Sequence, residues 1–206
     1  MNMVLRNETE KDYFAVENLT REAFWNVYKP GCDEHLLVHQ IRSLPCFIQE
    51  LDIVAEVNAA VVGSIIYSRS KLTDASDKEH EFITFGPISV HPGFQKRGIG
   101  SALIKHTIQL AGQMGYTAIF ITGNPAYYTR FGFERAFDYA IHLKGVAIHD
   151  TADYFMVKQL KPDVLNTVSG VFEFDPCFEV DPSLLDAYDK QFPPKVKEKL
   201  PGQLFD

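Results

Sequence analysis

The chain has 206 residues, which suits one domain of about 150 residues with an appendage. Its composition, 46% hydrophobic and 23% charged, is ordinary for a globular protein. A formal net charge of −7 argues against general binding to nucleic acids or to anionic membranes.

The hydrophobic patterns and the turn residues predict alternating strands and helices along the chain. Strands are expected at 4–6, 52–57, 60–68, 82–90, 117–122, 136–143, 154–160 and 171–174. Helices are expected at 9–25, 33–44, 98–114 and 183–191. No internal repeat is visible, and the chain from residue 161 onward differs in character from the rest.

Several boundaries have specific signals. Thr9 to Asp12 resembles a capping box, and Asp181 or Ser183 can cap the last helix. The stretch 71–81 is polar and charged, so we expect a surface loop there. Gly86-Pro87 interrupts the strand 82–90, and because proline cannot donate to a strand ladder, a bulge or splayed pairing is expected.

The chain contains three cysteines, Cys32, Cys46 and Cys177. Their spacing contains no C-x-x-C pair and no cluster with histidine, so neither a disulfide framework nor a metal site is predicted. Buried, reduced thiols are expected instead. The chain has no run of about 18 apolar residues and no leader pattern, so we expect a cytoplasmic protein without membrane contact.

The most informative stretch is 90–100, which reads V-H-P-G-F-Q-K-R-G-I-G. It connects a predicted strand to an amphipathic helix through glycines and basic residues. The first turn of a helix has unpaired N–H groups and the positive end of the macrodipole, and glycine lets a phosphate approach that backbone closely. This stretch is therefore a candidate phosphate-binding loop, although an ordinary strand–helix turn with a glycine cap also fits it.

Two common phosphate loops are excluded by spacing. Gly93 and Gly98 have the spacing of a Walker loop, but Ile99 and Gly100 stand where that loop requires lysine and serine or threonine. Leu103 stands where the dinucleotide fingerprint requires its third glycine. What remains is Q-x-x-G-x-G, beginning at Gln95.

This loop resembles the acetyl-CoA pyrophosphate loop of the GNAT superfamily of N-acetyltransferases. A second segment, G-N-P-A-Y-Y-T-R-F-G-F at 123–133, also resembles that family, which has a tyrosine on a short helix followed by x-x-x-Gly-Phe. In this chain that tyrosine is Tyr128, four residues before Gly132. The compressed form of the second motif is similar to a bacterial branch of predicted N-acetyltransferases.

The resemblance implies an α/β fold with a mixed, mostly antiparallel twisted sheet, splayed central strands and flanking helices. It covers residues 1–160, which we take as the acetyltransferase domain. Residues 161–206 are then a C-terminal extension packed on that domain. Three roles are left open for it: closing over the active site, forming a dimer contact, or covering a hydrophobic edge, and the last is favoured.

The resemblance also implies the reaction, which is transfer of an acetyl group from acetyl-CoA to an amine. It assigns acetyl-CoA binding to Ile88, Ser89, Val90, Gln95, Lys96, Arg97, Gly98, Ile99, Gly100, Ser101 and Asn124. Tyr128 is the candidate general acid for the departing thiolate, because a phenol with a pKa of about 10 is protonated at neutral pH. Aromatic packing is the alternative role for Tyr128, and a turn residue before Pro125 is the alternative for Asn124.

The general base and the amine acceptor stay open. Many GNAT enzymes have a glutamate on the central strand, but 82–90 contains none, which leaves Glu81, His91 or a chain of waters. A non-catalytic module that binds acyl-CoA is the competing hypothesis, and an enzyme using a different acyl donor is a third. Small amines, aminoglycosides, polyamines and protein N-termini all remain candidate acceptors, and a homodimer is one arrangement left open.

Overall fold

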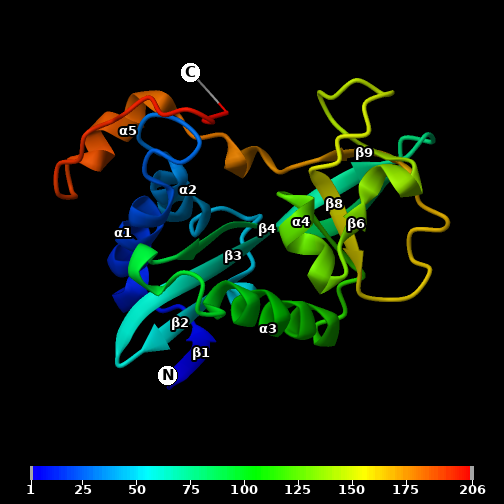
Figure 1. The fold of residues 1–206 in the computed structure, drawn as a ribbon. Helices are drawn as coiled ribbons and strands as arrows, with labels where there is room; N and C mark the ends of the chain where they lie inside the picture. The colour runs from blue at the N-terminus through cyan, green and yellow to red at the C-terminus, as the bar shows by residue number, and fades with distance from the viewer. Residues whose placement is uncertain (1, 205–206) are drawn as a thin grey trace. The chain divides into compact units, whose positions relative to one another are not determined.

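The computed structural model describes residues 2–204, and Figure 1 labels most of its elements. The strands are β1 (Met3–Asn7), β2 (Ile53–Val57), β3 (Ala60–Thr73), β4 (Glu79–Val90), β5 (Ala118–Thr122), β6 (Glu134–Arg135), β7 (Ile141–Leu143), β8 (Phe155–Gln159) and β9 (Gly170–Glu173). The α-helices are α1 (Tyr13–Phe24), α2 (Glu34–Ile41), α3 (Ile99–Gln113), α4 (Pro125–Tyr128) and α5 (Pro182–Asp189). None of these helices has the length and hydrophobicity of a transmembrane span.

The described chain divides into two units. Unit 1 contains residues 2–66, 87–103 and 176–204, and unit 2 contains residues 67–86 and 104–175. β3, β4 and α3 each contribute residues to both units, so each unit is described by itself below.

Unit 1 is built on antiparallel strands, with β1 paired to β2 and β2 paired to β3. Helices α1 and α2 bury their apolar faces on this sheet, where Val16, Val38 and Val54 form one cluster. The predicted capping box forms on the 3-10 turn Glu10–Asp12 that leads into α1. Asp12 accepts hydrogen bonds from the Thr9 backbone N–H (2.9 Å) and hydroxyl (2.8 Å), so the carboxylate holds the first turn in place.

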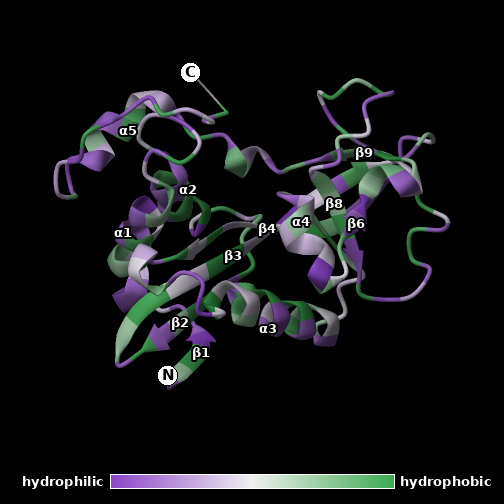
Figure 2. Cartoon of the chain, viewed as in Figure 1, coloured by the Kyte–Doolittle hydropathy of each residue, from purple (hydrophilic) through white to green (hydrophobic). Residues whose placement is uncertain are grey.

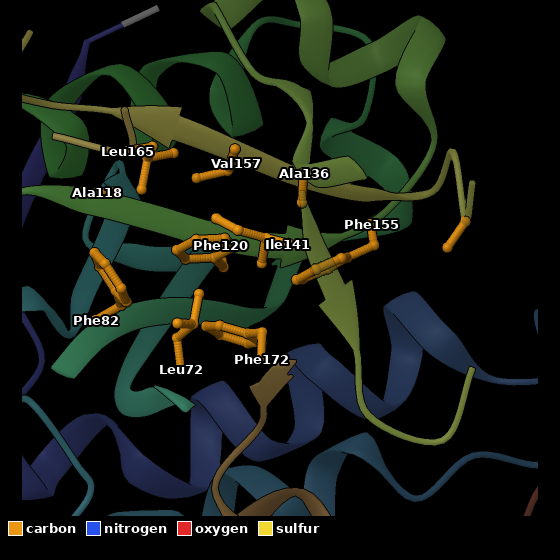
Figure 3. Packing of buried hydrophobic residues seen from close by; sticks show 11 residues of the cluster. Leu72, Phe82, Ala118, Phe120, Ala136, Ile141, Phe155, Val157, Leu165 and Phe172 are labelled. Carbon is orange, nitrogen blue, oxygen red and sulfur yellow. The ribbon is translucent and has the colours of Figure 1, made fainter. Parts of the chain in front are cut away.

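Unit 2 continues β3 and β4 and adds β5, β8 and β6 in that hydrogen-bonded order, with β9 on β3 and β7 on β9. Its core is rich in aromatic residues, and Figure 3 shows how they converge from several strands. The ring of Phe120 stacks on Phe172 at 4.4 Å between centroids and lies 5.7 Å from Phe155. Such rings bury large apolar areas, so this cluster supplies much of the stability of the unit.

The pairing pattern confirms the expected fold class. The pairs β1–β2, β2–β3, β3–β9, β5–β8 and β6–β8 are antiparallel, while β4–β5 and β7–β9 are parallel. The recorded register of β4 with β5 covers only Ile83 with Ile119 and Thr84 with Phe120, although both strands continue beyond these residues. The central strands are therefore splayed, as Gly86-Pro87 led us to expect, while β4 itself runs through these residues.

Helix α3 leads away from the candidate loop. Polar and apolar residues alternate around it (Figure 2). Its buried side chains include Ile99, Leu103, Thr107 and Ala111, which follow the i, i+4 spacing of one helix face, and the adjacent Ile104. The one polar member, Thr107, accepts a hydrogen bond of 2.9 Å from the Tyr67 hydroxyl within unit 2.

The predicted surface loop at 71–81 is wrong, because only 74–78 lie outside the strands. Asp74 makes the short turn, since its Oδ1 accepts from the N–H groups of Ser76 (2.8 Å) and Lys78 (3.1 Å). The charged residues beside the turn are strand residues that face solvent, and Lys71 pairs with Glu79 across the two strands at 2.7 Å. Their polarity reflects exposure and not a loop.

The predicted strand at 136–143 is also largely wrong. Ala136–Tyr139 form a 3-10 helix, and Ala140 follows in the left-handed region with φ of 54°. Only Ile141–Leu143 pair as a strand. Arg135 donates to the Asp138 carboxylate at 2.9 Å, a local contact that helps close the 3-10 turn in competition with the extended conformation.

Residues 176–204 contact α1 and α2 within unit 1. Tyr188 and Phe192 pack on Leu36, and the buried guanidinium of Arg21 donates from Nε to Asp189 at 2.7 Å. Asp181 caps α5, as one of the two predicted caps. The segment covers apolar surface of these helices.

Candidate active site

The predicted pyrophosphate loop lies in unit 1 between the end of β4 and the start of α3. A short 3-10 turn, Pro92–Phe94, follows β4, and His91 caps it by accepting the Gly93 N–H at Nδ1 (3.1 Å). Gln95 then donates from its side-chain Nε2 to the carbonyl of Val90 at 3.2 Å. The glutamine of the motif thus joins the two sides of the turn and fixes the direction in which the chain enters the loop.

Gly98 has the conformation that the loop argument requires. Its φ is +86°, in the left-handed region that favours glycine, and it stands directly before α3. Lys96 also has a positive φ of 60°. Residues 95–98 are exposed, so the loop presents its backbone and the N-terminus of α3 to solvent. Oriented N–H groups of this kind are suited to an anion.

The basic side chains of the loop are exposed. The Arg97 guanidinium lies over the ring of Phe94, 5.3 Å from its centroid. This cation–π contact holds Arg97 beside the loop backbone. Lys96 and Arg97 therefore add positive charge next to the α3 N-terminus, where it would strengthen attraction for a pyrophosphate.

The start of α3 is held against β3 by close packing at Gly63. The side chain of Ile99 is 1% exposed, and a Cβ built on Gly63 would lie 2.8 Å from its Cγ2. The same Cβ would lie 3.3 Å from the carbonyl oxygen of Ser89. Glycine at this strand position lets the helix N-terminus approach the sheet, and through it positions the loop.

Replacing Gly63 with alanine is expected to destabilise the fold by about 1–3 kcal/mol, because the new methyl group overpacks this contact. Urea denaturation of wild type and Gly63→Ala measures the change in the free energy of unfolding. Gly112→Ala is the matched control, since a Cβ at Gly112 meets nothing within 4 Å. Wild-type stability in Gly63→Ala would show that Ile99 can move away at no cost.

The side chains at the end of β4 take part in packing. Ser89 is fully buried, and its hydroxyl donates to that of Thr20 on α1 at 3.0 Å. Ile88 and Val90, the neighbours that point to the other side of the strand, are half-buried. Any contribution of Ser89 to a bound cofactor must therefore come from its backbone.

Tyr128 lies in unit 2, at the end of α4. Its ring is held by three aromatic neighbours, with centroids at 5.0 Å to Tyr127, 5.8 Å to Phe133 and 6.0 Å to Phe85. Burial raises the pKa of nearby Tyr67, and Tyr128 raises it further. The ring of Tyr128 is half-buried, which gives it a defined position without enclosing it.

Asn124 and Gly123 form the turn that presents Tyr128. Asn124 Oδ1 accepts the Ala126 N–H at 2.9 Å and caps α4, which is the turn role that its position before Pro125 allowed. A Cβ built on Gly123 would clash with Cε2 of Tyr128, so the ring rests against the glycine backbone. Glycine at 123 is therefore a requirement of the Tyr128 position.

Replacing Gly123 with alanine is expected to lower turnover severalfold, because the Tyr128 ring must move away from the new methyl group. The effect should be smaller than loss of the hydroxyl, since the phenol is retained. Steady-state release of CoA with an accepted amine measures it, beside Gly112→Ala as the control. Unchanged turnover would mean that the exact ring position has no influence on the rate.

Glu81 and His91, the two candidate side chains for the general base, make different contacts. Glu81 is exposed and lies 3.8 Å from Arg69. It is four residues, or ~13 Å along β4, from Phe85, the strand residue on which Tyr128 packs. His91 uses Nδ1 to accept the Gly93 N–H, so it shapes the turn. Neither geometry favours a side-chain base.

Comparison with known proteins agrees with this arrangement. Residues 49–135, which include both motifs, match the family model described as an acetyltransferase (GNAT) domain. The N-acetyltransferase YhbS of Escherichia coli is 26% identical over 176 residues, which cover 85% of this chain and 98% of YhbS. The chain is thus similar to GNAT acetyltransferases across both motifs.

Solved GNAT structures share the fold. A crystal structure of E. coli YhbS in complex with CoA has a TM-score of 0.74 at 24% identity and covers 86% of this chain and 92% of its own. A GNAT family acetyltransferase from Brucella melitensis in complex with acetyl-CoA has a TM-score of 0.68 at 25% identity, with coverage of 86% and 99%. The resemblance stated from the sequence is thereby confirmed.

The site residues fall into two groups. Ile88, Ser89, Val90 and the loop 95–101 lie in unit 1, while Asn124 and Tyr128 lie in unit 2. No role was predicted for Gly63, or for Gly123 at the start of the second motif, although these glycines position α3 and Tyr128. A glycine inside a predicted strand and a glycine directly after another were the available signals, because such positions mark close approach of a neighbour.

Proposed function

We propose that this GNAT domain transfers an acetyl group from acetyl-CoA to a primary amine. The geometry of the loop carries the proposal: Gly98 in the left-handed region, the exposed N-terminus of α3, and two basic side chains beside it. The names of the relatives support it, since YhbS is called an N-acetyltransferase and the Brucella protein was crystallised with acetyl-CoA.

In this proposal the loop 95–101 binds the pyrophosphate of acetyl-CoA through its backbone N–H groups. Lys96 and Arg97 add charge, and Asn124 serves the pantetheine arm. The backbone of Ile88 and Val90, on the strand whose pairing to β5 stops early, holds the pantetheine and polarises the thioester carbonyl. Donors aimed at that oxygen stabilise the oxyanion that forms when a neutral amine attacks the carbonyl carbon.

Tyr128 then acts as general acid. When the tetrahedral intermediate collapses, the carbon–sulfur bond breaks and the thiolate takes the phenolic proton. The packing of Tyr128 between aromatic rings and Gly123 supports this role, because a catalytic acid must be held in a fixed position. The amine loses its proton to water, because Glu81 lies beside Arg69 and His91 accepts the Gly93 N–H.

Two measurements test the proposal in sequence. Isothermal titration calorimetry with acetyl-CoA, and with CoA as a comparison, measures binding. Thiol release is then followed with a panel of small amines, polyamines, aminoglycosides and peptides with free N-termini. Binding followed by amine-dependent release of one CoA per acetylated product is expected, and absence of acetyl-CoA binding would overturn the proposal.

A non-catalytic acyl-CoA-binding module is the second candidate. The observation that favours it is the lack of a glutamate on β4 within 82–90. Binding of acetyl-CoA without turnover across the whole amine panel would support this role. Comparing the affinities for acetyl-, succinyl- and longer acyl-CoA tests the acyl preference. The cytoplasmic location, the homodimer and the boundary at residue 161 stay predictions from the sequence.

A further inference from the structure

Two cysteines that lie far apart in the sequence meet inside unit 1. The Sγ atoms of Cys46 and Cys177 lie within 4.8 Å of each other. Both thiols are reduced, and the residues are 5% and 7% exposed. Cys46 stands in the segment after α2, and Cys177 stands in the 3-10 turn Pro176–Phe178 that precedes α5.

The surroundings of the pair hold the two segments together. Ile41 and Ile66 share a buried cluster with both cysteines, and Phe47 and Phe178 pack against it. The other contacts of 176–204 with α1 and α2 described above are non-covalent, namely hydrogen bonds, ion pairs and ring packing. A covalent bond between Cys46 and Cys177 would therefore be a different kind of link between this segment and the end of α2.

The third cysteine is placed differently. Cys32 Sγ lies 3.5 Å from His35 Nδ1 and 3.8 Å from the carbonyl oxygen of Arg21. Burial raises the pKa of the Cys32 thiol, which makes it a poor nucleophile. All three thiols are buried, but only Cys46 and Cys177 form a close pair among the described residues, so Cys32 is a matched control.

We propose that Cys46 and Cys177 form an intramolecular disulfide when the chain meets a two-electron thiol oxidant of low molecular weight. Side-chain rotation must bring the sulfurs from their present separation to the bonded distance of about 2.05 Å. Because each segment is packed by its own aromatic neighbour, we expect this to need small local shifts and no unfolding.

The chemistry balances with a disulfide or an azo oxidant. With oxidised glutathione, one thiolate attacks a sulfur and releases one glutathione. The second thiolate then attacks the mixed disulfide and releases the other glutathione. With diamide, the two thiols lose two electrons and two protons, and the azo nitrogens gain them to give the hydrazine. In both cases one S–S bond forms within the chain.

The bond would close a loop that contains most of the chain. Cross-linking distant residues restricts the unfolded state and so stabilises the folded one. A rise in Tm of several degrees is expected for the oxidised chain, reversed by dithiothreitol. This effect does not depend on acetyl-CoA or on the proposed reaction.

The test treats the full-length, chelator-washed protein with diamide under native conditions. Thiols are then alkylated after denaturation, and the intact mass and non-reduced peptides are measured. We expect a loss of 2 Da, one alkylated cysteine at Cys32, and a cross-linked peptide pair containing Cys46 and Cys177. Cys46→Ala and Cys177→Ala should each abolish the mass change and the Tm rise, and Cys32→Ala should retain both.

Three alkylated thiols after treatment, under conditions that oxidise the urea-unfolded chain, would overturn the proposal. A disulfide that includes Cys32 would overturn it as well. Peptide mapping of the wild type decides these outcomes even where an alanine variant fails to fold.

Discussion

Replacing Tyr128 with phenylalanine is expected to lower the turnover number by about 100-fold and to leave acetyl-CoA affinity nearly unchanged. The substitution keeps the ring between Phe85 and Phe133 and against Gly123, and it deletes only the hydroxyl. A general acid interacts with the leaving sulfur mainly in the transition state, so its loss lowers kcat more than it changes binding.

Complete inactivity is not expected for Tyr128→Phe. A cysteine-like thiol has a pKa of about 8.5, so the thiolate of CoA can leave partly without help. Steady-state CoA release between pH 6 and 10 should therefore show the largest difference from wild type at low pH. The deficit should narrow as the pH rises past the thiol pKa.

Tyr127→Phe is the matched control, because it removes the neighbouring phenol from the same short helix. Arg130 lies over the Tyr127 ring at 4.0 Å, a contact that phenylalanine retains. Near wild-type turnover is expected for this control. Equal turnover in Tyr128→Phe at neutral pH would contradict the acid role or mean that chemistry is not rate-limiting, and single-turnover kinetics separates the two.

Replacing Gly98 with valine is expected to weaken acetyl-CoA binding more than tenfold, or by ~1.4 kcal/mol or more. Gly98 has a φ of +86°, which a β-branched residue rarely adopts. No protein atom lies within 4 Å of a Cβ built there, so the new side chain meets open space in the folded chain. It would instead occupy the space through which a phosphate approaches the N-terminus of α3.

A control is needed to distinguish the effect of backbone strain at Gly98 from the loss of phosphate binding. Gly115 supplies the control, because its φ is +95° and a Cβ there also meets nothing within 4 Å. It lies beyond the other end of α3. Similar losses of thermal stability are expected for Gly98→Val and Gly115→Val, but calorimetry should find weakened acetyl-CoA binding only in Gly98→Val. Wild-type affinity in a folded Gly98→Val would remove the basis for assigning the loop to pyrophosphate.

The sequence predicted the parts of the fold that depend on local patterns. Helix α3 has one buried face with regular spacing, and α5 has an aspartate cap, so both were predictable. The stretch 71–81 was not, since exposed strand residues such as Lys71 and Glu79 are as polar as those of a loop. The Ala136–Tyr139 turn depends on Arg135 and Asp138 meeting, which alternation of polarity does not encode.

The candidate site shows the same division. Gly98 and the tyrosine motif were recognisable because glycine conformation and motif spacing are local properties. The close approaches at Gly63 and Gly123 depend on Ile99 and Tyr128 arriving from elsewhere, so only the presence of a glycine hinted at them. The meeting of Cys46 and Cys177 had no signal at all in their spacing.

Unit 1 is built from segments that are far apart in the sequence, and this affects how the protein folds during synthesis. Arg21 is fully buried and is paired with Asp189, which lies 168 residues later in the sequence. A ribosome therefore releases α1 and α2 long before it synthesises the segment that covers them. Until α5 emerges, a guanidinium lacks its carboxylate and Leu36 lacks its aromatic cover. We therefore expect unit 1 to complete its folding only after α5 has been synthesised. Premature termination before Asp189 is expected to yield a product that chaperones and proteases recognise.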